Sequence, residues 1–275
     1  MNYQFVHNED SEVEKPFIAQ LLAQQSHRCR WQYLPGQKDD ISGQGRENWR
    51  EVVLKDRLLA ALKRINLNAD GKPWLDAARL NQAWRDLDRL TASAGHSLME
   101  KNQAATTLLL EGTVVEGLTG WNAGRNQRIH YIDWHHPENN EFLIINQFRV
   151  DEPDGQHKKF ILPDIVLFVN GIPLVVIECK SPATTNPIEE GINQLLRYSN
   201  QRHWLEAKEG NEKLFHYAQL LVVTDYDHAL MACPCAQFEH YLAWKDCYPT
   251  LSTQSDKQPY SGRSPVPAQT TRRRH

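Results

Sequence analysis

The sequence lacks any apolar run that approaches the roughly 20 residues a membrane-spanning helix needs. Its N-terminus also lacks the basic start of a signal peptide and opens with Asn8, Glu9, Asp10 and Glu12. Cysteine is scarce, with five residues at irregular spacing, so no disulfide framework is indicated. We therefore expect a soluble protein in a reducing cytoplasm, without a membrane partner.

A strong net charge is absent as well, because 31 Lys and Arg face 34 Asp and Glu and leave a formal charge of −3. That balance excludes a global attraction to nucleic acid, so any DNA contact must come from a local basic surface. The chain contains no G-x-x-x-x-G-K-[S/T] phosphate loop and no evident S-adenosylmethionine motif. We expect neither an ATP site nor methyltransferase activity.

Hydrophobic periodicity divides the chain into two parts. Helical spacing predicts helices over 12–24, 49–65, 76–91 and 97–111, with a loop at 35–45. Short β-branched and aromatic runs predict strands at 113–116, 128–133, 142–149, 160–169, 172–180 and 220–224, with a helix at about 187–202. The pattern predicts an α/β fold, a mixed β-sheet flanked by helices. We expect one domain over 1–248, helical over about 12–111 and carrying its sheet over about 113–225, and a disordered tail over 249–275.

One predicted hairpin is apolar along its length and charged only at its open end. Two apolar runs flank Asn170-Gly171, a strong hairpin signal. Asp164 precedes the first run, while Glu178 and Lys180 close the second. Strand alternation places Glu178 and Lys180 on one face and the Cys179 side chain on the other, where it should be a small core residue.

The length of the turn decides what lies opposite Asp164. A two-residue turn would place Ile177 there, on the wrong face. A three-residue loop over 170–172 would instead set Asp164 opposite Glu178, with Cβ atoms about 5 Å apart. We therefore predict the three-residue loop, with Gly171 in a left-handed conformation.

Two adjacent carboxylates indicate a divalent cation, because without one they repel and one is forced neutral. Oxygen ligands of this kind suit Mg²⁺, which keeps several waters for a substrate phosphate or a nucleophile. Lys180 would orient that water or stabilise the developing negative charge. The alternative is a strand-end ion pair between Glu178 and Lys180, with Asp164 capping a turn.

The helix that follows carries Gln194 and Tyr198, which lie one turn apart and away from the apolar stripe of Ile192, Leu195 and Leu196. An amide and a phenol stacked in this way can face the metal site or the DNA backbone. The alternative is an exposed polar helix face.

Asp164, Glu178-Cys179-Lys180 and 194–198 together resemble the PD-(D/E)xK nuclease signature followed by its QxxxY element. The combination is similar to the N-terminal endonuclease domain of the restriction (R) subunit of type I restriction-modification enzymes. The phrases at 136–140, 146–148 and 170–174 also look like that family. The resemblance runs from about Glu12 to about Trp244.

The resemblance implies a restriction-endonuclease-like core and Mg²⁺-dependent hydrolysis of double-stranded DNA. The expected metal ligands are Asp164, Glu178, the backbone carbonyl of Cys179 and Glu14, with Glu12 a less favoured choice. Lys180, Gln194 and Tyr198 are expected to serve in catalysis. Target recognition would belong to a specificity (S) subunit, which with a modification (M) subunit is the expected partner.

The family continues into a helicase-like motor, whereas the resemblance here stops near residue 245. We expect either a truncated subunit or a nuclease domain standing alone. Two rivals follow: a silent fragment that binds DNA or the restriction complex, and a standalone PD-(D/E)xK nuclease. His130, His135, His136 and Glu138 match no standard zinc spacing, nor do Cys233 and Cys235, so we expect no metal there. The run 272–274 would add weak, salt-sensitive DNA affinity at most.

Overall fold

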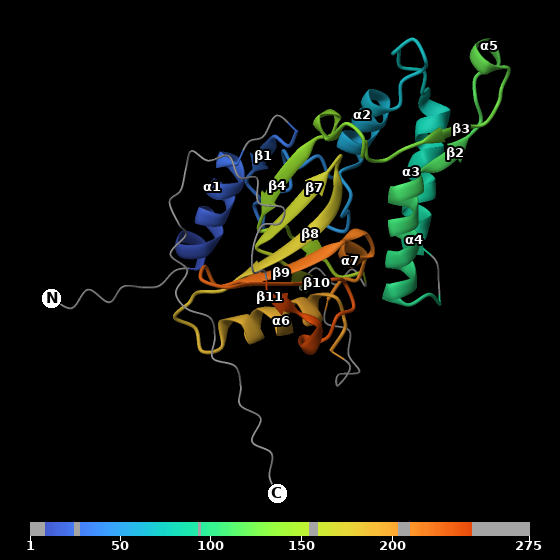
Figure 1. The fold of residues 1–275 in the computed structure, drawn as a ribbon. Coiled ribbons are helices and arrows are strands. Elements are labelled where there is room, and N and C mark those ends of the chain that lie inside the picture. The colour runs from blue at the N-terminus through green and yellow to red at the C-terminus, as the bar shows by residue number, and fades with distance from the viewer. Residues whose placement is uncertain (1–8, 25–27, 93–94, 154–158, 203–209, 244–275) are drawn as a thin grey trace, which may run out of the picture.

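The computed structural model describes residues 9–24, 28–92, 95–153, 159–202 and 210–243. A sheet of seven strands forms its centre, in the order β1-β4-β7-β8-β9-β10-β11 (Figure 1). The strands are β1 (Trp31–Leu34), β4 (Phe142–Asn146), β7 (Ile165–Val169), β8 (Ile172–Cys179), β9 (Leu220–Thr224), β10 (Ala229–Ala232) and β11 (Leu242–Ala243). The pairs β1–β4 and β8–β9 are parallel and the other neighbours are antiparallel, so the sheet is mixed, as predicted.

Two short ladders lie outside this sheet. One pairs β2 (Thr113–Val115) with β3 (Gln127–Ile129), and the other pairs β5 (Val150–Asp151) with β6 (Phe160–Ile161). Figure 1 shows β2, β3 and α5 (Thr119–Asn122) reaching away from the central sheet beyond α3 and α4.

The helices largely follow the predicted pattern. They are a π-helical turn (Asp10–Glu14) that continues into α1 (Lys15–Ala23), then α2 (Lys55–Ile65), α3 (Ala77–Ala92), α4 (Leu98–Glu111), α6 (Pro187–Tyr198) and α7 (Lys213–Tyr217). Short 3₁₀ turns cover Pro137–Asn139 and Phe238–His240. A capping box between Ser97 and Glu100 starts α4, and Gly112, with φ +76°, ends it.

The second predicted helix begins later than expected. Residues 49–54 are not helical, and the backbone N–H of Leu54 donates to the carbonyl of Gly171 at 2.8 Å. The apolar residues Val52 and Val53 are buried all the same, because their side chains belong to the larger hydrophobic core. Burial without a helix produced the same apolar pattern.

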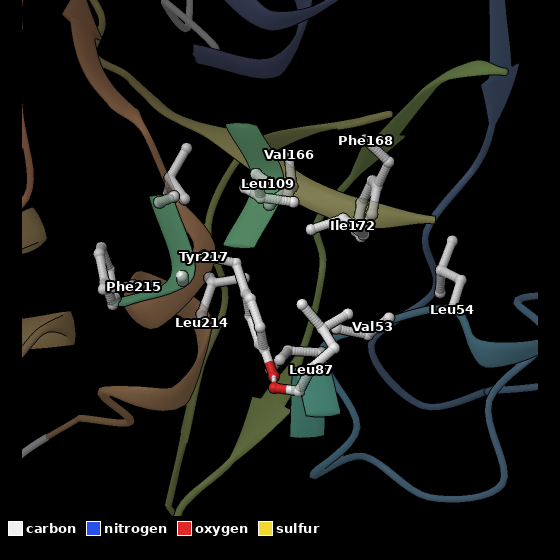
Figure 2. Close-up of a cluster of buried hydrophobic side chains, with 14 of the residues drawn as sticks. Val53, Leu54, Leu87, Leu109, Val166, Phe168, Ile172, Leu214, Phe215 and Tyr217 are labelled. Atoms are coloured by element: carbon white, nitrogen blue, oxygen red, sulfur yellow. Dashed lines mark hydrogen bonds between the residues drawn. The ribbon is translucent and has the colours of Figure 1, made fainter. Parts of the chain in front are cut away.

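Two apolar layers cover the faces of the central sheet. On one face Val166 and Phe168 join the larger core, where they meet α7 and the α3–α4 pair; Figure 2 shows part of it, with Tyr217 donating to the carbonyl of Leu87 at 3.3 Å. On the other face Ile165 and Leu167 pack with the first helical segment. α1 lies beside β1 and α6 packs along β8 and β9 (Figure 1). Successive side chains of β7 thus point alternately into the two layers.

Several elements were not predicted. β1, β5, β10, β11 and α7 are short, and the central sheet consequently extends beyond 113–225 in both directions. No helix in the described ranges is long and apolar enough to span a bilayer. The predicted tail at 249–275 lies outside the described residues.

Candidate active site

The turn of the β7–β8 hairpin has two residues, so the three-residue loop was wrong. Val169 pairs with Ile172, and Asn170 and Gly171 adopt φ values of +51° and +77°. Positive φ at both positions is what a type I′ turn requires, and Asn-Gly is its preferred sequence. The left-handed conformation predicted for Gly171 is confirmed.

A β-bulge nevertheless brings the two acids together. The register shifts by one residue between Leu167 and Phe168, because β8 carries the extra residue Leu174. Beyond this bulge the strands stay in register to their last pair, which leaves Asp164 and Glu178 as the next opposed positions. Turn and bulge together produce the arrangement that the longer loop was expected to give.

Glu178 is the most deeply buried charge of the site, with 0% of its surface exposed. Its Oε1 accepts from Lys180 Nζ at 2.8 Å, whereas its Oε2 is buried without a hydrogen-bond partner among the described residues. Burial, and then the charge of Asp164, raises the pKa of Glu178 well above its usual range. An unpaired carboxylate oxygen beside a second acid needs either a proton or a cation.

Asp164 is tied to the opposite strand through the backbone. Its Oδ2 accepts from the N–H of Cys179 at 2.8 Å. Burial raises the pKa of Asp164, although the charge of Lys180 and that backbone hydrogen bond act against the rise. The Cys179 side chain points into the smaller core, as expected, so only its backbone faces the acids.

Lys180 is a buried ammonium with all three protons engaged. Its Nζ donates to Glu178 at 2.8 Å, to the carbonyl of Cys179 at 3.0 Å and to Glu9 at 3.0 Å. Burial alone would lower the pKa of Lys180, but the carboxylates around it outweigh burial and raise that pKa above its usual range. Lys180 therefore carries a positive charge at neutral pH and is not a proton acceptor.

The first helical segment brings a further buried acid to the open end of the hairpin. Glu14 is only 2% exposed and accepts from Asn146 Nδ2 at 2.6 Å and from Gln147 Nε2 at 2.8 Å. The same Nε2 of Gln147 donates to Asp164 Oδ1 at 3.1 Å. One amide group thus bridges Glu14 and Asp164.

Gln194 and Tyr198 meet each other, as their spacing predicted, with the Gln194 amide donating to the Tyr198 hydroxyl at 2.7 Å. Tyr198 is not on an exposed polar face, because it is 4% exposed and belongs to the larger core. Its hydroxyl donates to the carbonyl of Leu162 at 3.2 Å, and burial raises its pKa to about 12. The pair therefore anchors the segment that leads into Asp164.

The residues at the open end of the hairpin offer oxygen ligands that suit a hard cation. No cluster of three or more His, Cys, Asp or Glu side chains in the described part of the chain is arranged to hold a metal. Two carboxylates still fit Mg²⁺, which uses one or two protein carboxylates and completes its shell with water and phosphate. The unpartnered Oε2 of Glu178 is the observation that fits a cation.

Sequence reasoning missed three residues of the site: Glu9, Asn146 and Gln147. The phrase at 146–148 had served only as part of the family likeness. Two amides at the end of the apolar run 142–145 were the available signal, because a polar pair next to a buried strand requires partners. Glu9 offered no comparable signal.

The fold and the site define a mixed α/β chain whose central sheet carries paired acids and a lysine at the open end of the β7–β8 hairpin. Residues 8–233 match the family described as the type I restriction enzyme R protein N terminus. The chain belongs to that family.

Curated relatives carry matching names. The type I restriction enzyme HindI endonuclease subunit of Haemophilus influenzae is 29% identical over 238 residues, which cover 83% of this chain and 20% of that protein. A Methanocaldococcus jannaschii protein, provisionally named the type I restriction enzyme MjaIXP endonuclease subunit, is 27% identical over 239 residues, 86% of this chain and 20% of that one. The type I restriction enzyme EcoprrI endonuclease subunit of Escherichia coli is 35% identical over 102 residues, 37% and 29% of the two chains. The chain thus spans about a fifth of the first two relatives.

Proposed function

We propose that the chain is a Mg²⁺-dependent DNA endonuclease domain with a restriction-endonuclease-like core, which hydrolyses phosphodiester bonds in a type I restriction-modification system. The observation that carries this proposal is the buried, unpartnered Oε2 of Glu178 next to Asp164. Burying a charge without a partner is costly, so such an oxygen at the end of a strand calls for a ligand.

Asp164 and Glu178 would hold the ion, together with the backbone carbonyl of Cys179. A bound Mg²⁺ would lower the pKa of a coordinated water and neutralise charge that develops on the phosphate. In this structure the Cys179 carbonyl accepts from Lys180, so the ammonium shares that oxygen with the proposed site.

Lys180 would act through its charge. Because its pKa is raised, it stays protonated and can stabilise negative charge on the attacking or phosphate oxygens. Glu178 and Glu9 hold the ammonium on two sides, which fixes its position before substrate arrives. This arrangement is electrostatic preorganisation rather than proton abstraction.

Gln194 and Tyr198 would support the site from α6. The Tyr198 hydroxyl fixes the carbonyl of Leu162, two residues before Asp164. α6 lies close to the end of β8, since a Cβ at Gly191 would stand 3.4 Å from Cγ of Lys180, the residue that follows this strand. The two side chains therefore act by placing the segment that carries Asp164.

Double-stranded DNA is the proposed substrate, and modification and specificity subunits are the proposed partners. The names of the relatives support this, because they are endonuclease subunits of type I restriction enzymes. The chain's own charge of −3 favours delivery to DNA by such partners over a strong attraction of its own.

A nicking assay on supercoiled plasmid with Mg²⁺ tests the proposal. We expect Asp164→Ala and Lys180→Ala to reduce nicking by at least about 100-fold, the usual effect of removing a group that stabilises a transition state. Lys63→Ala, at an exposed position of α2, is the matched control and should keep full activity. Metal binding should be measured in parallel by calorimetry with Mn²⁺.

The outcomes separate the alternatives. DNA binding without nicking, in a chain that also takes up no metal, would support a silent fragment. Nicking that survives in both variants would exclude this site. Cleavage by the purified chain without any partner would favour a standalone nuclease of the same fold.

A further inference from the structure

We infer that Gln147 is a positioning residue that aims the Asp164 carboxylate, and that Glu14 acts through this amide rather than as a metal ligand. The inference rests on the proposed metal site and assigns residues that support it. The observation behind it is the single Nε2 group that donates to both Glu14 and Asp164, at 2.8 and 3.1 Å.

The backbone at Gln147 is held in an unfavourable conformation. Its φ is +47°, in the left-handed region that non-glycine residues rarely adopt. Its N–H donates to the carbonyl of Asp164 at 2.8 Å, so the residue sits directly beside the acid it serves. Strain of this kind persists where the surroundings enforce it, and such positions concentrate at functional sites.

Glu14 has both carboxylate oxygens committed to amides. Oε1 accepts from Asn146 and Oε2 accepts from Gln147. Asn146 is fixed in turn by Tyr33, whose hydroxyl donates to Asn146 Oδ1 at 3.0 Å, and by the N–H of Gly36, which donates to the same oxygen at 2.9 Å. A carboxylate held in this way serves as an anchor for the two amides.

The loop after β1 closes this network from the outside. A Cβ at Gly36 would stand 1.7 Å from the Asn146 carbonyl oxygen, so the loop backbone approaches β4 as closely as only glycine allows. The network therefore runs from this loop through Asn146, Glu14 and Gln147 to Asp164. It leaves one oxygen of Asp164 facing Gln147 and the other facing the Cys179 N–H.

The chemistry of the amide explains why glutamine stands here. An NH₂ group has two protons and can donate to two carboxylates at once, which keeps Glu14 and Asp164 apart without adding a charge. Loss of the amide would therefore leave the Asp164 carboxylate less fixed.

The test measures Mn²⁺ binding to the whole chain by calorimetry, with Mn²⁺ standing in for Mg²⁺. We expect Gln147→Met to weaken binding about 10- to 100-fold, as is typical when a partner of a metal ligand is removed. Gln127→Met, on the remote β3 strand, is the matched control and should leave the Mn²⁺ affinity unchanged.

Gln147→Gly separates positioning from folding, because glycine relieves the positive φ and still removes the amide. It should keep the melting temperature of the wild type yet bind Mn²⁺ as weakly as Gln147→Met. Glu14→Gln should weaken binding less than Asp164→Asn does. Activity is not needed for any of these readouts.

Three results would overturn the inference. If wild type binds Mn²⁺ and both Gln147 variants bind it equally well at the same pH, the metal site stands and the role of Gln147 falls. A Glu14→Gln variant as defective as Asp164→Asn would make Glu14 a ligand. If wild type binds no Mn²⁺ at all, the proposed metal site itself fails, and the inference falls with it.

Discussion

The two ends of the β7–β8 hairpin bury polar groups in opposite ways. At the turn, Asn170 is 0% exposed, and its amide accepts from Glu141 and Arg64 and donates to Tyr131 and Asn140. At the open end, Glu178 is equally buried, yet one of its oxygens has no partner among the described residues.

Net charge and hydrogen-bond satisfaction separate the two ends. A neutral amide with every partner in place adds specificity and stability to a core. A buried carboxylate near a second one costs stability unless a ligand or a proton completes it. Polar burial alone therefore does not identify a candidate site, whereas a buried polar group with an unsatisfied atom does.

The largest effect on stability is expected at the turn, from Gly171→Ala. A Cβ there would stand 2.6 Å from the carbonyl oxygen of Leu54, and φ is +77°. We expect a loss of about 3 kcal/mol or more, from a left-handed alanine and the steric conflict together. Urea unfolding of the two proteins measures it.

Gly43→Ala is the control for that change, since its φ of +79° is similar and nothing lies within 4 Å of its added Cβ. It should lose only about 1–2 kcal/mol, the usual penalty for a left-handed L-residue. Equal losses in the two variants would show that close contact with Leu54 adds nothing to the cost of the left-handed alanine.

At the open end, by contrast, a substitution should increase the stability of the protein. Glu178→Gln removes a buried carboxylate whose pKa is raised well above its usual range by burial. We expect a higher Tm for the metal-free protein, because an incompletely paired buried charge costs stability, while Mn²⁺ binding is lost. A variant that is less stable than wild type would show that Glu178 is a structural ion-pair partner of Lys180.

The pH dependence of stability should also distinguish the two ends of the hairpin. The pKa values of Asp164 and Glu178 are raised by burial, so the folded state holds their protons more tightly than the unfolded state does. Stability from this source is fully present below the ordinary carboxylate pKa of about 4 and is lost as pH rises through the folded values.

We therefore expect the Tm of the metal-free protein to fall more steeply than that of Glu178→Gln as the pH rises above about 4. Saturating Mn²⁺ should flatten the wild-type curve, because the cation replaces the proton. Parallel curves for the two proteins would contradict the raised pKa of Glu178.

The same hairpin shows how far the sequence carries the argument. Alternation in 172–180 correctly placed the side chains of Glu178 and Lys180 on one face of the strand and that of Cys179 on the other. This alternation is a property of a single strand and does not depend on which strands pair with it. The prediction that Asp164 lies opposite Glu178 assumed a three-residue loop, whereas the hairpin has a two-residue turn and a bulge. A bulge at Leu174 depends on how β8 meets its neighbours, and no local pattern marks it.

The supporting residues were harder to predict for a similar reason. Glu14 was placed near the site only by family likeness, and its partners Asn146 and Gln147 lie more than 130 positions away in the sequence. Helical spacing paired Gln194 with Tyr198 correctly but placed the phenol away from the apolar stripe of the helix. Tertiary packing decides that face, since the ring fills the core beneath Leu162.

The smallest effect is expected from Cys179, whose backbone serves the open end while its side chain serves the core. Burial, and then the charge of Asp164, raises the pKa of its thiol well above the usual range, so it should resist alkylation in the folded protein. Cys179→Ala should cost about 1 kcal/mol for the lost sulfur volume. Mn²⁺ affinity should be unchanged, because the carbonyl and the N–H that contact Lys180 and Asp164 remain.

Cys233→Ala is the control for that measurement, since Cys233 is exposed and its loss should cost nothing measurable. A Cys179→Ala protein with normal stability but weakened Mn²⁺ binding would mean that the thiol itself reaches the ion. In that case the two faces of β8 would not be separate, and the distinction between a packed face and a catalytic face at the open end of the hairpin would fail.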